Sequence, residues 1–202
     1  MKNILNKIAY KIRSKLIDQW QYSYLEYNLD SFFTALPKLD ETIEIRLAKI
    51  SDIDAIKKDL FLEIPDDIEN DKKYFSQLGD DNFNCYIAIK DHKVIHYFQF
   101  YYAAIQSPLI KTPYGKKIIK KNDSYLGSTF TTKEFRSLWI VPHSINLILE
   151  NLKTKESVKR ALVVVHKDTA GAENFYKRLG FSVIDNASPK NLFEAWFKYL
   201  LP

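Results

Sequence analysis

The segment "AGAENFYKRLGFSVI", residues 170–184, decides the fold. Phe175 and Tyr176 follow Ala172 by three and four residues, the spacing of apolar residues on one face of a helix. Gly180 comes next, at the position where a glycine in the left-handed conformation commonly ends a helix. The segment therefore predicts a short amphipathic helix that stops at Gly180 and leads directly into a strand.

Two strands and a helix are predicted just before this segment. "ALVVVHK", residues 161–167, is a continuous, largely β-branched run typical of a strand buried on both faces. "SYLGSTFT", residues 124–131, predicts a second strand, and residues 141–152 predict a helix between the two. This order of elements favours a sheet with helices packed on its faces.

The first half of the chain adds strands and helices of its own. "TIEIRLA", residues 42–48, alternates apolar and polar residues as a half-buried strand does, and helical segments follow at residues 52–63 and 66–79. Residues 82–90 and 93–105 predict the two strands of a hairpin. We interpret residues 106–124 as a long excursion between strands, residues 192–200 as a last strand, and the whole as an α/β (α+β) fold with a mixed sheet.

The chain resembles the GCN5-related N-acetyltransferase (GNAT) superfamily. Its late helix and strand match the family pattern A-x-x-F/L-Y-x-x-x-G-F, with Ala172, Phe175, Tyr176, Gly180 and Phe181 at the five positions. The resemblance extends from residue 42 to about residue 200 by the order of elements. It implies a mostly antiparallel sheet in which strands 124–131 and 161–167 are parallel, central and splayed, and it implies acetyl-CoA as co-substrate without a metal.

The turn "TTKEFRSLWIVP", residues 131–142, lies where the family binds the pyrophosphate of acetyl-CoA. The first amides of a helix have no partner within it, and the helix dipole favours an anion there. The family turn has the form R/Q-x-x-G-x-G/A. Arg136 keeps its first position, whereas Trp139 and Val141 replace the glycines, so we expect a weaker grip on the phosphates. The cofactor contacts implied by the resemblance are Phe130, Thr131, Arg136, Ser137, Leu138, Trp139, Ile140 and Val141, with Thr169 where many relatives have an asparagine.

The resemblance also assigns chemical roles. Tyr176 matches the tyrosine that supplies a proton to the departing thiolate, although a core tyrosine on an amphipathic helix would fit the same pattern. Glu134 is the candidate base that would deprotonate the amine, with His96, Asp123 and His166 as other candidates. The predicted acceptor-binding residues are Gln99, Tyr101 and Tyr125, and half-buried sheet residues would show the same alternation.

The N-terminus is amphipathic. Residues 1–20 repeat an isoleucine or leucine every fourth residue between lysines and arginines. We interpret residues 1–41 as a helix and an aromatic connector in front of a 42–202 domain, and expect residues 1–36 to be helical and packed. The helix would either dock on its own domain or a partner subunit, as in a homodimer, or lie on an anionic membrane surface.

Composition narrows the remaining classes. A single cysteine, Cys85, rules out an intramolecular disulfide, and together with four scattered histidines it provides no zinc-ligand pairs. The net charge of +5 is too mild to favour nucleic acid as a partner. We expect a cytoplasmic protein, peripheral at the inner membrane face if the N-terminal helix binds lipid.

Two functions of different class follow from these observations. One is an N-acetyltransferase acting on the primary amine of a small acceptor. The turn "FRSLWIVP", residues 135–142, resembles relatives associated with polysaccharide or amino-sugar pathways, which favours an amino sugar. The other is a cofactor-poor relative that keeps the fold as a binding or scaffolding module. Binding of acetyl-CoA separates the two.

Overall fold

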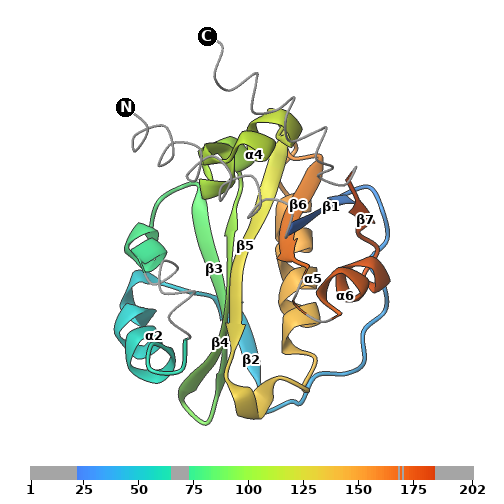
Figure 1. Cartoon of the computed structure of the whole chain (residues 1–202). Helices are drawn as coiled ribbons and strands as arrows, with labels where there is room; N and C mark the ends of the chain where they lie inside the picture. Colours follow the sequence, from blue (N-terminus) through green and yellow to red (C-terminus); the bar gives the residue numbers. More distant parts are fainter. Residues whose placement is uncertain (1–21, 65–72, 168, 170, 185–202) are drawn as a thin grey trace, which may run out of the picture.

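The strands form one seven-stranded sheet in the order β2-β3-β4-β5-β6-β1-β7 (Figure 1). The computed structural model describes residues 22–64, 73–167, 169 and 171–184. Among the described strands, β5 and β6 run parallel, and the other neighbouring pairs are antiparallel. The strands are β1 (Tyr22–Asn28), β2 (Glu44–Leu47), β3 (Phe83–Lys90), β4 (Lys93–Tyr101), β5 (Asp123–Thr131), β6 (Arg160–His166) and β7 (Ser182–Val183). The predicted mixed, mostly antiparallel sheet is confirmed.

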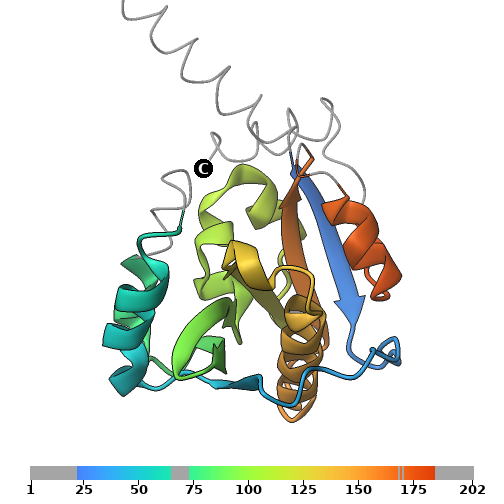
Figure 2. The ribbon, with the colours of Figure 1, turned by 90° about the horizontal axis from the view of Figure 1, so that it is seen from below.

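Helices cover both faces of the sheet. One face packs against α5 and α6, and the other packs against α2 and α4; Figure 2 shows α4 and α5 on opposite sides of the strands. The helices are α2 (Ile53–Leu60), α4 (Pro113–Ile118), α5 (Ile140–Lys153) and α6 (Ala172–Arg178). Short 3-10 turns are η1 (Ile50–Asp52), η3 (Lys73–Gln77), η4 (Ala104–Gln106), η5 (Pro108–Lys111) and η6 (Lys133–Phe135). None of the helices in the described ranges is long and apolar enough to cross a bilayer.

Alternation along each strand divides its side chains between these two faces. On β4, Phe98 and Phe100 are buried against α5, whereas Tyr97 and Tyr101 are buried among side chains of α2 and η3. Successive side chains of a strand point to opposite faces, so a central strand covered on both sides is apolar throughout. The α5 face and the α2–α4 face are therefore two separate parts of the core. Alternate residues along a strand pack into one part or the other.

The parallel pair is short. The β5–β6 ladder joins Asp123 with Arg160 at one end and Leu126 with Val163 at the other. Beyond it, Thr129, Phe130 and Thr131 pair with β4 alone among the described strands. A register shift between Phe98 and Phe100 faces Gly127, immediately beyond the last ladder pair. A Cβ at Gly127 would lie 3.3 Å from the carbonyl oxygen of Gln99, so glycine permits this close approach. The structure thus has the parallel pair predicted from the sequence, and pairing stops where β5 is irregular.

Over residues 22–36 the predicted helix was wrong, whereas the predicted packing is confirmed, since Leu25, Tyr27 and Leu29 are buried in the core. Residues 22–28 form β1, which pairs with β6 over its whole length and also with β7, and no helix follows before β2. The physical reason is the two-residue period of "YSYLEYN": Leu25 and Tyr27 enter the α5 face, whereas Tyr24 packs with α4 on the other. The amphipathic segment 1–20 and the predicted strand 192–200 lie outside the described residues.

Two other predicted segments also differ from the structure. Residues 106–124, expected to be an irregular excursion, contain η5 and α4, each of which begins with a proline at its first position. Of the predicted helix 66–79, residues 73–77 form a 3-10 turn and residues 65–72 lie outside the described part. Helices this short escape a search for long hydrophobic periods.

Candidate functional site

The chain turns sharply between the end of β5 and the start of α5. After η6, Trp139 caps α5 with φ 61° and ψ 13°, in the left-handed region. Residues with a Cβ seldom adopt this conformation, and glycine adopts it freely. The turn therefore has a backbone shape suited to glycine even though a tryptophan occupies the position, and the residue is 49% exposed.

Backbone donors are available where α5 begins. The first hydrogen bond of the helix runs from the amide of His143 to the carbonyl of Trp139, at 3.2 Å. The amides of Ile140 and Val141 have no acceptor within the described part of the chain, and Pro142 has no N–H to offer. Because α5 is 14 residues long, its dipole adds to these two donors, and an anion would be stabilised there.

Arg136 is fixed beside this turn. Its Nε donates to the carbonyl of Thr131 at 3.0 Å, and its guanidinium carbon lies 5.7 Å from the centroid of the Phe130 ring. The two terminal nitrogens have no partner among the described residues. The charge is thus anchored through one nitrogen while the others stay available to a phosphate.

The two bulky residues at the glycine positions lie differently. Val141 is half-buried and packs against the core formed with α5. Leu138 packs with Ile43, Ile95 and Ile140 on the inner side of the turn, and Ser137 is exposed. Of the replaced glycines, only Trp139 therefore directs a large side chain outward.

Tyr176 lies on α6 and points into the α5 face of the sheet. It is 6% exposed, and its ring centroid lies 5.2 Å from those of Phe175 and Phe181. Burial raises the pKa of the Tyr176 hydroxyl well above its usual range. No hydrogen bond joins this hydroxyl to another described residue, and its raised pKa keeps it protonated.

The sequence matches no family model and no curated protein, but solved structures match the fold. NAA60 from Arabidopsis thaliana, solved with acetyl-CoA, superposes with a TM-score of 0.53 at 16% identity, over 71% of this chain and 86% of that one. An aminoglycoside acetyltransferase from an uncultured soil metagenomic sample, solved with sisomicin, has a TM-score of 0.50 at 15% identity, over 69% and 88%. A GCN5-related N-acetyltransferase from Kribbella flavida has a TM-score of 0.51 at 10% identity over 80% of this chain, which spans 53% of that protein's length.

The chain has the GNAT fold.

Within this GNAT fold, Gln99, Tyr101 and Tyr125 come together on the face opposite Tyr176. Gln99 and Tyr101 are buried, Tyr125 is half-buried, and the rings of the two tyrosines stack at 6.1 Å. Gly127, beside Gln99, was not singled out from the sequence. Its signal was a lone glycine within a strand pattern, which often marks a bulge.

Thr169 lies beyond the carboxyl end of β6. Its amide donates to the carbonyl of His166 at 3.0 Å, its carbonyl accepts from Ala172 at 3.1 Å, and the residue is exposed. It therefore shapes the entry to α6, and no described contact joins it to the turn at Trp139.

Glu134 lies on η6, next to the cofactor turn, and not beside Tyr176 or the predicted acceptor residues. It is exposed on η6 and lines a hollow of about 400 Å³ with side chains of α2 and of the β3–β4 turn, including Lys58 and His92. Neither Tyr176 nor the predicted acceptor residues line this hollow. The structure therefore does not bring Glu134 and Tyr176 together.

The other candidate bases already have structural partners. His96 is fully buried, with Nδ1 2.8 Å from the hydroxyl of Thr131 and Nε2 3.0 Å from that of Ser144, and burial lowers its pKa to about 3. It is a neutral imidazole that ties β4, β5 and α5 together. Asp123 binds Arg160, and the ring of His166 lies edge-on to Tyr22 at 5.0 Å.

Proposed function

We propose that this chain is an acetyl-CoA-dependent N-acetyltransferase that acts on the primary amine of a small acceptor, with an amino sugar as the favoured class. The observation that carries the proposal is the left-handed Trp139 before α5. A backbone conformation that costs a tryptophan free energy is retained at the position where the turn presents its free amides. A fold kept only as a scaffold would have no need of it.

Arg136 and the amides of Ile140 and Val141 would hold the phosphates. The amides donate along the axis of α5, and the guanidinium supplies a full positive charge from the side of β5. The indole of Trp139 stands where the family has a hydrogen atom. It would shift the phosphates or weaken their grip relative to a glycine turn.

The pantetheine arm and the thioester would lie along β5 beyond Leu126. Among the described strands, the backbone groups of this part of β5 that face β6 have no ladder partner, because the β5–β6 ladder ends at Leu126. A backbone N–H at this position would polarise the thioester carbonyl, because a donor aimed at developing negative charge stabilises the transition state.

Transfer requires a neutral amine to attack that carbonyl. The C–N bond forms, the C–S bond breaks, and the sulfur leaves with the electron pair as a thiolate, while the amine loses one proton. Burial makes Tyr176 a weaker acid than a free phenol, so it would stabilise the thiolate chiefly as a hydrogen-bond donor. Glu134 remains the proposed base, and reaching the amine from η6 would require a water relay.

Gln99, Tyr101 and Tyr125 would bind the acceptor. They offer amide and phenol groups beside stacked rings, a combination that suits a hydroxyl-rich ring such as an amino sugar. The aminoglycoside acetyltransferase of the same fold, solved with sisomicin, supports an acceptor of this class.

The test is acetyl transfer from acetyl-CoA to a panel of amines. We expect acetylated product, detected by mass, with glucosamine or an aminoglycoside rather than with polyamines or peptide N-termini. Tyr176→Phe is the matched variant, since it removes one oxygen and keeps the ring. Binding of acetyl-CoA without transfer to any amine would overturn the acceptor class, and absence of both would favour the binding-module alternative.

A further inference from the structure

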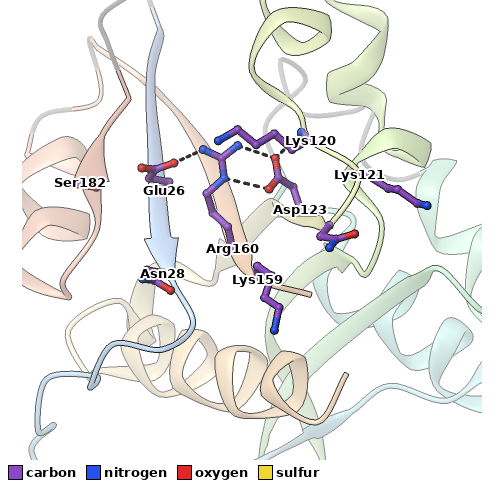
Figure 3. A pocket seen from close by; sticks show the side chains of 9 residues that line it. Glu26, Asn28, Lys120, Lys121, Asp123, Lys159, Arg160 and Ser182 are labelled. Atoms are coloured by element: carbon purple, nitrogen blue, oxygen red, sulfur yellow. Dashed lines mark hydrogen bonds and ion pairs between the residues drawn. The ribbon is translucent and has the colours of Figure 1, made fainter. Parts of the chain in front are cut away.

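A second polar pocket lies where β5 and β6 begin (Figure 3). The Trp139 turn follows the other end of β5. The volume of the pocket is about 560 Å³, within the range of small-ligand sites. The pocket lies between Asp123 and Arg160 on one side and Glu26 and Asn28 of β1 on the other. Ser182 of β7 also lines it, so four strands contribute to one hollow.

Arg160 organises the floor of this pocket. Its Nε and Nη2 donate to the two carboxylate oxygens of Asp123 at 3.0 and 2.6 Å, Nη2 also donates to the carbonyl of Ile118 at 2.9 Å, and Nη1 bonds Glu26. Figure 3 shows the guanidinium between the two carboxylates. Both acids are therefore engaged by a cation already, which reduces the repulsion that they would exert on an incoming anion.

The lysines around this floor are not engaged. Lys120 and Lys159 lie on opposite sides of Arg160, and Lys121 points outward (Figure 3). Within the part of the chain that is described, none of their ammonium groups has an acceptor, since the recorded bonds of Lys120 and Lys159 are those of their backbones. Four cationic and two anionic side chains line the pocket, which leaves a net charge of +2.

Asn28 adds a neutral donor of fixed orientation. Its side-chain oxygen accepts from the amide of Asp30 at 3.0 Å, so its NH₂ group is the end left for a ligand. Two ammonium groups and one amide are all donors, so they suit the several acceptor oxygens of a phosphate better than they suit a neutral ligand. A phosphomonoester carries about −1.5 to −2 at neutral pH, which offsets the charge of the lining.

We propose that this pocket binds a phosphomonoester or pyrophosphate group of a small molecule, held by Lys120, Lys159 and the Asn28 amide. The site is distinct from the acetyl-CoA turn. β5 is nine residues long, so at ~3.4 Å per residue its two ends are about 27 Å apart. Leu162 lies two residues after Arg160 on the same face of β6 and is buried with Tyr24 and Tyr114. These side chains lie between the pocket and the end of β5 where its pairing with β6 stops.

Titration of the ¹⁵N-labelled chain with inorganic phosphate and pyrophosphate, followed by NMR, tests this assignment. We expect saturable shifts at the amides of Asn28, Asn122 and Lys159, separate from any at Ile140 and Val141. Lys120→Met with Lys159→Met should weaken the first set by at least about tenfold, because two charge-assisted bonds are lost. Methionine keeps most of the aliphatic stem, and Arg160 with its partners is untouched.

The matched control is Lys49→Met with Lys57→Met, which removes the same charge at two exposed lysines on and just before the η1–α2 segment. It should leave the pocket shifts unchanged. Equal weakening in both double variants, or shifts confined to Ile140 and Val141, would overturn the site.

A vesicle arm distinguishes the source of the phosphate. If phosphatidylcholine vesicles containing phosphatidic acid sediment the wild type but not the Lys120/Lys159 variant, the phosphate belongs to a lipid headgroup. Binding of free phosphate without such sedimentation assigns the pocket to a soluble ligand.

Discussion

Trp139 offers a quantitative test of the turn, through the variants Trp139→Gly and Trp139→Ala. Both remove the indole, but only glycine also relieves the left-handed backbone at φ 61°. That conformation costs a residue with a Cβ about 1 to 2 kcal/mol, and the extra freedom of glycine in the unfolded chain offsets about 0.4 to 1 kcal/mol. The free energy of unfolding of Trp139→Gly should therefore exceed that of Trp139→Ala by roughly 1 kcal/mol.

The loss of the indole determines how far both variants fall below the wild type in free energy of unfolding. Trp139 is 49% exposed, so about half of its side chain is in contact with the protein. At ~25 cal/mol per Å² and about 100 Å² of retained contact, removing it costs about 2.5 kcal/mol. We expect the free energy of unfolding to fall by about 2.5 kcal/mol in Trp139→Ala and by about 1.5 kcal/mol in Trp139→Gly.

Urea unfolding of both variants gives these values directly. The control is the same pair at Lys57, an exposed residue inside α2, where glycine should be less stable than alanine by about 1 kcal/mol. The order of stability must therefore reverse between the two sites. If Trp139→Gly is no more stable than Trp139→Ala, the left-handed turn is not strained. The turn would then give no support to the proposed acetyl-CoA site. If the indole crowds the phosphates, both Trp139 variants should also bind acetyl-CoA more tightly than the wild type.

Four further outcomes follow from the structure. Tyr176→Phe should lower kcat by about 100-fold and leave both acetyl-CoA affinity and stability unchanged, because its hydroxyl has no partner in the described ranges; a kcat equal to wild type would remove Tyr176 from the chemistry. His96 has a pKa near 6.5 when unfolded and about 3 when folded, so the unfolded state takes up a proton first and stability falls as pH drops through that window. It should fall by about 2 kcal/mol between about pH 6.5 and 5, and a His96→Gln variant that kept the whole slope in urea titrations would contradict this. Asp123→Asn should lower the free energy of unfolding by about 3 kcal/mol, because it breaks a buried ion pair with Arg160. Glu26→Gln, at the more exposed acid, should lower it by less than about 1 kcal/mol, and equal losses in urea unfolding would contradict this ranking. Deleting residues 1–36 removes β1 from between β6 and β7 and should abolish cooperative thermal unfolding, whereas a cooperative melt would show that β1 is dispensable.

The strands around the motif were predictable because their patterns are local. Residues 161–165 are continuously apolar, and the structure buries β6 between two layers of helices. Gly180 adopts φ 95° at the end of α6, as its position after the helix predicted. A hydrophobic period and a helix-ending glycine can be recognised from the local sequence alone, without knowing which distant segments they contact.

Partnerships between distant segments could not be predicted in this way. The strand nature of residues 22–28 depends on pairing with β6, more than 130 residues away, and the aromatic content of the segment obscured its alternation. The pocket at Arg160 depends on four strands coming together, and its lysines look like ordinary solvated charges in the sequence. At Trp139 the sequence showed only that a glycine was missing, whereas the left-handed conformation is a property of the folded turn.

Isothermal titration calorimetry with acetyl-CoA tests the central proposal most directly. We expect saturable binding with a Kd at or below about 1 mM, weakened in Arg136→Ala and unchanged in the control Lys49→Met with Lys57→Met. Absence of any saturable heat at millimolar acetyl-CoA, in the wild type and in Trp139→Gly alike, would contradict the assignment of this turn to the cofactor.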